Sequence, residues 1–162
     1  MEDTRYALAF VSAAWFDHPA KKLTTIGITG TKGKTTTTYL VKSILENAGR
    51  KVGLVGTIEI IIGDTHIHAV NTTPESYLLQ EYFAKMVESG CDTVVMEVSS
   101  QALMLHRTQG FVFDFGIFTN LEPDHIGPNE HGSFEEYAHC KSLLFQPVSY
   151  THLRAHETAA NL

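Results

Sequence analysis

The feature that most restricts the fold is the segment GTKGKTT, which lies between an apolar run and a stretch with helical spacing. Residues 23–29 predict a short buried strand, and residues 35–48 predict a helix that ends at Gly49. Glycines in such a connection let the amides at a helix N-terminus approach a phosphate group. Lys34 supplies positive charge and the Thr35 hydroxyl can bind magnesium. The pattern predicts a phosphate-binding loop made of Gly30, Thr31, Lys32, Gly33, Lys34, Thr35 and Thr36.

This loop is a variant of the usual phosphate-loop motif. The position five before Gly33 is Ile28, whereas the common pattern has glycine there. The alternative is an ordinary glycine-containing turn between a strand and a helix. The adjacent Lys34 and Thr35, at the start of the predicted helix, favour phosphate binding.

The rest of the chain alternates between strand and helix patterns. Apolar residues at helical spacing predict helices, and short apolar runs predict buried strands. Gly63 and Asp64 are suited to the turn of a hairpin. The predicted class is α/β, with a mostly parallel sheet flanked by helices, right-handed crossovers and a small β-hairpin at one edge. The expected helices are 3–16, a helix that starts at Pro74 and ends near Gly90, and 134–145, and the expected strands are 52–57, 58–62, 65–70, 93–98 and 113–119.

Composition excludes two classes of partner. The formal net charge is −6, the pI is about 5.8 and basic residues do not cluster, so we expect no nucleic-acid binding. The longest apolar run, 52–62, is broken well before the roughly 20 residues needed to cross a bilayer, and the N-terminus does not resemble a signal peptide. We expect a cytoplasmic monomer without membrane contact. Cys91 and Cys140 are expected to be free thiols.

The last residues differ from the rest. The stretch VSYTHLRAHET at 148–158 resembles one reading frame of a sequencing-library adaptor, and the alternative is a native polar helix end. We therefore divide the chain into 1–22, a leading helix and linker, 23–147, the folded domain, and 148–162, a non-native tail. Histidines in that tail are not interpreted as a site.

Several further motifs follow the loop in order: NTTPE at 71–75, MEVSS at 96–100, FTNL at 118–121, Asp124-His125, and Tyr137 to Lys141. Together with GTKGKTTT, this series resembles the Mur ligases over residues 23–147. The EVSS string followed by His106-Arg107 is most similar to the MurE type. The resemblance implies the central ATP-binding domain of an ATP-dependent amide ligase, cut off at both ends, that adds the third amino acid of the peptidoglycan stem peptide to UDP-MurNAc-L-Ala-D-Glu.

The resemblance also implies roles for individual residues. Thr35 and Glu97 would hold a first Mg²⁺ beside ATP, while His125 and a carbamylated Lys141 would hold a second. Lys34, His125 and Lys141 are then the expected catalytic residues. The plainer interpretations are a capped strand end for Glu97, a loop residue for His125 and a solvated helix lysine for Lys141. The substrate nucleotide is expected to contact Asn71, Thr72, Thr73, Ser99 and Arg107.

Two departures from the family pattern and several alternatives remain. Leu105 stands where some relatives have glutamine, and the loop from Asp124 to His131 is longer than the common form; we interpret His131 as a surface loop residue. Histidines 66, 68, 106 and 139 receive no role. A folylpolyglutamate or cyanophycin synthetase, a non-catalytic nucleotide-binding module and a GTPase-like switch are the rival functions, although no N-K-x-D string is present. The added amino acid, lysine or diaminopimelate, would be selected by a domain outside this chain.

Overall fold

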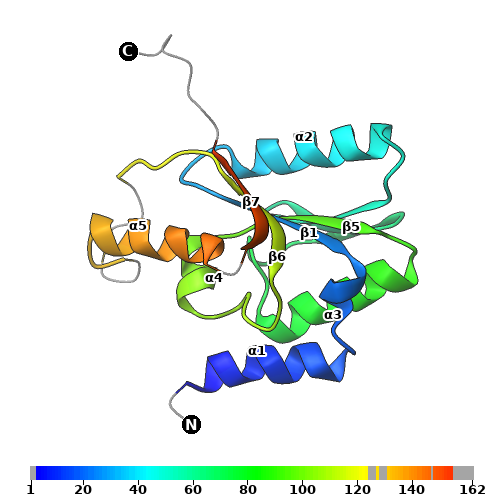
Figure 1. Cartoon of the computed structure of the whole chain (residues 1–162), viewed down its shortest axis with the longest axis horizontal. Coiled ribbons are helices and arrows are strands. Elements are labelled where there is room, and N and C mark those ends of the chain that lie inside the picture. The colour runs from blue at the N-terminus through cyan, green and yellow to red at the C-terminus, as the bar shows by residue number, and fades with distance from the viewer. Residues whose placement is uncertain (1–2, 124–126, 128–130, 147, 155–162) are drawn as a thin grey trace.

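The computed structural model describes residues 3–123, 127 and 131–146 and the backbone of 148–154. The described strands form one seven-stranded sheet in the order β4-β3-β2-β5-β1-β6-β7, with helices on both faces (Figure 1). The predicted α/β class is confirmed. The strands are β1 (Thr24–Thr29), β2 (Val52–Val55), β3 (Glu59–Ile62), β4 (Thr65–His68), β5 (Thr93–Glu97), β6 (Phe113–Phe118) and β7 (Val148–Arg154). The α-helices are α1 (Thr4–Trp15), α2 (Lys34–Asn47), α3 (Ser76–Glu88), α4 (Ser100–Met104) and α5 (Phe134–Ser142), with 3-10 turns η1 (Pro19–Lys22) and η2 (Leu143–Phe145).

Strand β1 lies at the centre of the parallel part of the sheet. It pairs with β5 on one side, where Ile28 is opposite Glu97, and with β6 on the other, where Thr29 is opposite Phe118. The carboxyl ends of the three strands therefore meet at one edge. In parallel α/β sheets this edge is where ligands bind.

The hairpin predicted at the sheet edge is confirmed. Strand β3 pairs antiparallel with both β2 and β4, and the β3–β4 turn contains Gly63 with a φ of 55°. That left-handed backbone is easily adopted by glycine. On its other side, strand β2 pairs in parallel with β5.

Two apolar clusters hold the helices against the sheet. Helix α2 covers one face, where Val41 and Leu45 pack on Ile26, Ile28 and Val95. Helices α1 and α3 lie on the opposite face (Figure 1). There the larger cluster includes buried side chains of α3 and of the central strands, among them Leu79, Phe83, Met86, Val94 and Met96.

The leading helix is confirmed as α1, but its buried face is not the one with the large apolar residues. The apolar side chains at helical spacing that predict this helix include Val11 and Trp15, which are 64% and 74% exposed. The small residues Ala9, Ser12 and Ala13 are buried instead. Gly110 explains why small residues of α1 are buried, because α1 lies very close to it: a Cβ at Gly110 would lie 2.5 Å from the Ala9 carbonyl oxygen. Only small side chains allow so close an approach.

Other boundaries also differ from the prediction. Helix α3 begins at Ser76 with Glu75 in an extended conformation as its N-cap, so Pro74 precedes the helix instead of starting it. Helix α4 and strand β7 were not predicted. Residues 148–154 pair in parallel with β6 and are not a helix end; the adaptor origin of this segment stays a prediction.

Two smaller expectations concern the thiols and the membrane. Cys91 and Cys140 are both buried free thiols, as predicted. Burial, with a smaller contribution from Glu136, raises the pKa of the Cys140 thiol. Among the helices that the structure describes, none is long and apolar enough to cross a membrane.

Candidate functional site

The loop between β1 and α2 has the backbone of a phosphate-binding turn. Gly33 caps α2 with a φ of 80°, and Lys34 is the first helical residue. Gly30 has a φ of 150°, and a Cβ there would lie 1.9 Å from Thr119 Oγ1. Both glycines are therefore required by geometry. The first amides of α2 point out of the helix end, where the helix dipole favours an anion.

Glu97, at the end of β5, lies beside this loop. Its side chain is buried, and its Oε2 accepts a hydrogen bond from Thr35 Oγ1 at 2.9 Å. Thr57 donates its backbone N–H to Oε1 at 2.9 Å and its hydroxyl to Oε2 at 3.1 Å. A Cβ at Gly56 would lie 2.7 Å from Oε1, so this glycine makes room for the carboxylate. These contacts fix Glu97 beside the start of α2.

The pair of Thr35 and Glu97 suits a magnesium ion. Mg²⁺ bound to nucleotide phosphates takes one or two protein oxygen ligands and completes its octahedron with phosphate and water. Within the described residues, no group of three or more His, Cys, Asp or Glu side chains is placed to hold a metal. The donor set fits an ion shared between the protein and phosphates. His125, the expected ligand of a second metal, lies outside the described residues.

Two lysines converge on one carbonyl oxygen of the loop. Lys34 Nζ donates to the carbonyl oxygens of Gly30 at 2.9 Å and Thr31 at 3.0 Å. Lys141 Nζ, from α5, also donates to the Gly30 oxygen at 2.9 Å and lies 4.4 Å from the centroid of the Tyr137 ring. Lys141 is 3% exposed, so the interpretation as a solvated helix lysine does not hold.

A cavity of about 470 Å³ opens beside these lysines. It brings together residues from four separate segments of the chain. The predicted substrate residues all line it, together with three polar residues that were not predicted. The lining consists of Lys34, Asn71, Thr72, Thr73, Ser99, Ser100, Gln101, Met104, Arg107, His131 and Lys141.

Thr73 and Arg107 hold the cavity wall in place. The Thr73 hydroxyl donates to the Glu97 carbonyl oxygen at 2.9 Å and accepts from the Ser99 amide at 3.1 Å. Arg107 Nη1 donates to the Thr73 carbonyl oxygen at 3.1 Å, and its Nη2 pairs with Glu75 at 2.6 Å. Arg107 Nε is buried and has no hydrogen-bond partner among the described residues. The guanidinium therefore sits in the wall of the cavity.

His131 was predicted to be a surface loop residue, and that prediction was wrong. It is 2% exposed, and its Nε2 lies 2.9 Å from Ser100 Oγ. Its ring packs against Tyr137 with the centroids 5.2 Å apart. The burial depends on α4 and α5 coming together, and the loop pattern carries no signal of that contact. Ser100 was quoted only as part of a motif, and Gln101 and Met104 carried no motif of their own.

Comparison with known proteins identifies the family. A family model described as the Mur ligase middle domain matches residues 28–156. The chain belongs to this family. The predicted family is confirmed, and the curated Mur ligases that it resembles are of the predicted MurE type. A UDP-N-acetylmuramoyl-L-alanyl-D-glutamate--2,6-diaminopimelate ligase from Caldanaerobacter subterraneus subsp. tengcongensis is 53% identical over 146 residues, which are 90% of this chain and 30% of that protein.

Other Mur ligases give the same result. The Clostridium perfringens ligase of the same name is 51% identical over 151 residues, 93% of this chain and 31% of that protein. This chain thus spans about 30% of the length of these relatives. A solved structure of a ligase with that name superposes with a TM-score of 0.77 at 26% identity, covering 91% of this chain and 30% of that one. A Mycobacterium tuberculosis folylpolyglutamate synthase complexed with ADP and AMPPCP shares the fold, with a TM-score of 0.69 at 16% identity, over 96% of this chain and 42% of that one.

Proposed function

We propose that this Mur ligase domain binds Mg-ATP and a UDP-MurNAc-dipeptide as part of an enzyme that joins an amino acid to the dipeptide. The observation that carries the proposal is the cavity in which the phosphate-loop Lys34 lies beside Thr72, Thr73, Ser99 and Arg107. One wall of this cavity suits the phosphates of ATP, and the other suits the anionic groups of a nucleotide sugar. The relatives named as 2,6-diaminopimelate ligases support diaminopimelate over lysine as the added amino acid. Both ATP and the nucleotide sugar are cytoplasmic metabolites, so the proposal includes that location.

The chemistry requires charge to be neutralised at each step. The D-glutamate carboxylate attacks the γ-phosphorus of ATP, which releases ADP and leaves an acyl phosphate; the incoming amine then displaces phosphate to form the amide. In-line transfer between anions depends on positioning and electrostatic stabilisation. Magnesium would supply positive charge at the phosphates, and Thr35 and Glu97 would hold it. Lys34 supplies a further positive charge at the helix end, next to the loop amides from Gly30 to Thr36.

The cavity wall would orient the second substrate. Asn71, Thr72, Thr73 and Ser99 present amide and hydroxyl groups, and Arg107 presents a planar fork that suits a carboxylate or phosphate. The Arg107 side chain is already fixed by Thr73 and Glu75 at 3.1 and 2.6 Å. A preordered guanidinium loses less entropy on binding than a mobile one.

Lys141 belongs to the same proposal as a carbamate. Lys141 Nζ lies 2.9 Å from the Gly30 carbonyl oxygen of the phosphate loop, and reaction of the neutral Lys141 amine with carbon dioxide would give an anion there and release a proton. An anionic oxygen at this position could support the second magnesium ion together with His125. Burial of Lys141 keeps the group within the cavity.

The phosphate loop is tested by replacing its lysine. We expect Lys34→Ala to abolish Mg-ATP binding, measured by isothermal titration calorimetry, because the Lys34 ammonium is placed at the loop. Lys85→Ala is the matched control, since that lysine is exposed on α3 and pairs with Glu81. Unchanged ATP affinity in Lys34→Ala would refute the proposed function. Equal affinity for GTP and ATP would instead favour a nucleotide-binding switch.

A further inference from the structure

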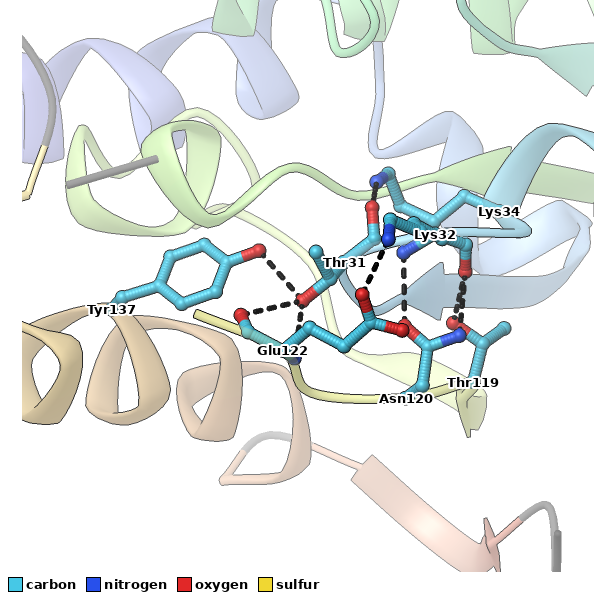
Figure 2. Close-up of polar contacts among 7 residues, drawn as sticks. All are labelled: Thr31, Lys32, Lys34, Thr119, Asn120, Glu122 and Tyr137. Atoms are coloured by element: carbon cyan, nitrogen blue, oxygen red, sulfur yellow. Dashed lines mark hydrogen bonds and ion pairs between the residues drawn. The ribbon is translucent and has the colours of Figure 1, made fainter. Parts of the chain in front are cut away.

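The segment that follows β6, residues 119–122, lies against residues 31 and 32 of the phosphate loop (Figure 2). Thr119 continues the β1–β6 ladder, because its N–H donates to the Thr29 carbonyl oxygen at 3.0 Å. Beyond that point β1 has ended and the loop has begun. The next contacts join Asn120 to the loop.

Asn120 pairs with the loop through both its main chain and its side chain. Its carbonyl oxygen accepts from the Thr31 N–H at 3.0 Å. Its Oδ1 accepts from the Lys32 N–H at 2.9 Å, and its Nδ2 donates to the Lys32 carbonyl oxygen at 3.1 Å. The carboxamide thus engages both backbone groups of one residue, as a neighbouring strand would. Among the side chains, only asparagine and glutamine offer a donor and an acceptor in this planar arrangement.

Neighbouring contacts reinforce this pairing. The Thr119 hydroxyl donates to the same Lys32 carbonyl oxygen at 2.8 Å, and Glu122 pairs with the Lys32 side chain. Gly30 permits the close approach, since a Cβ there would lie 3.1 Å from both the N and O atoms of Asn120. On the far side of the loop, Tyr137 donates to Thr31 Oγ1 at 3.0 Å (Figure 2). The backbone of residues 31 and 32 is therefore held by the segment that follows β6, and the Thr31 side chain is held by α5.

We propose that Asn120 is a positioning residue for the phosphate loop. The inference rests on the proposed function, because it assumes that the amides from Gly33 onward bind phosphate. The direction of those amides depends on the backbone of Thr31 and Lys32, which Asn120 holds. Asn120 would act through the loop, because its carboxamide is bonded to the Lys32 backbone. A loop that is already ordered binds its ligand without a further loss of conformational entropy.

The test compares Mg-ATP binding with dipeptide binding in the full-length ligase that contains this domain. We expect Asn120→Ala to raise the Kd for Mg-ATP about tenfold, as two backbone hydrogen bonds are lost, while the KM for UDP-MurNAc-dipeptide stays within twofold. Thr119→Ala removes one hydrogen bond to Lys32 and is expected to raise the Kd about threefold. If Asn120→Ala does not fold, the ATP affinity of Thr119→Ala tests the inference by itself.

Asn47→Ala serves as the matched control. Asn47 also donates from Nδ2 to a backbone carbonyl oxygen, that of Ser43 at 2.8 Å, but it is exposed on α2 away from the loop. This variant should bind Mg-ATP as the unchanged protein does. Unchanged ATP affinity in both Asn120→Ala and Thr119→Ala would overturn the inference, as would an equal loss of ATP and dipeptide binding. Loss of binding in Lys34→Ala together with those results would leave the proposed function standing.

Discussion

Lys141 lies in an unusual environment for a lysine on a helix, because its side chain is buried. Lysine is rarely buried without a partner of opposite charge or a strong hydrogen-bond acceptor. Here the amine faces the Gly30 carbonyl oxygen and the Tyr137 ring at the edge of the cavity. Its burial at the edge of the cavity, next to the phosphate loop, supports the proposed carbamate.

The carbamate proposal predicts chemical rescue. In the full-length enzyme, we expect Lys141→Ala to lose most ligase activity and to regain part of it when a short-chain carboxylic acid is added, because the acid replaces the carbamate oxygens. Lys141→Arg should stay inactive, since guanidinium cannot be carbamylated. Product formation is measured with and without the acid. Wild-type activity in Lys141→Ala would remove the role.

At the scale of elements, the amino ends of the central strands are joined by a polar cluster far from the site. Asp92 accepts from Arg50 Nε at 2.8 Å, from the Lys51 N–H at 3.2 Å and from Thr93 Oγ1 at 2.7 Å. Arg50 also donates to Thr24 Oγ1 at 3.1 Å, so the cluster ties the starts of β1, β2 and β5 together. Burial opposes ionisation of Asp92, but the hydrogen bonds from Thr93, Lys51 and Arg50 outweigh it and lower the pKa of the carboxyl group.

The lowered pKa predicts a pH-dependent loss of stability. A carboxyl group whose pKa is lower in the folded state stabilises the fold when the pH is above its pKa in the unfolded state, about 3.9. This contribution is lost as the pH falls through the pKa of the folded state. We expect Asp92→Asn to reduce the free energy of unfolding by about 1 kcal/mol at pH 7. The effect is modest because the Asp92 side chain is half exposed. Below about pH 4 the reduction should be smaller. Urea unfolding at several pH values measures this. Asp64→Asn, in the exposed β3–β4 turn, should have no comparable effect, and a loss independent of pH would contradict the assignment.

Elements set by local patterns could be predicted, whereas those set by packing could not. The strand, loop and helix around Lys34 follow from residues next to each other in sequence, and so does the hairpin at Gly63. The buried face of α1 was missed because it depends on Gly110, far along the chain. Similarly, Glu97 was identified through the family resemblance of its motif, but His131 is buried next to Ser100, which belongs to α4 and is distant in sequence. The spacing of apolar residues predicts that a helix has an apolar face, but it does not predict which element packs against that face.

At the scale of the whole molecule, the proposed function implies that the site described here is one wall of a larger one. The relatives are about three times the length of this chain, and in the proposed reaction the amine must be held close to the acyl phosphate. We expect the 162-residue chain by itself to bind Mg-ATP weakly and to form no amide product, at most releasing phosphate. Chromatographic assay for the tripeptide nucleotide checks this. Tripeptide formation by the isolated chain would show that the domain is sufficient.

The central place of β1 also matters during synthesis of the protein. Both partners of β1 are made much later, because Phe118 of β6 leaves the ribosome about 90 residues after Thr29. The other partner of β1, strand β5, is made about 70 residues after β1, because Thr93 pairs with Thr24. At elongation rates of about 5–20 residues per second, β1 therefore waits for roughly 3 to 14 seconds before its first neighbour is made. Unpaired apolar strands are where chaperones bind and where aggregation starts. The strand that later carries the phosphate loop is thus one that needs protection while the rest of the sheet is being made.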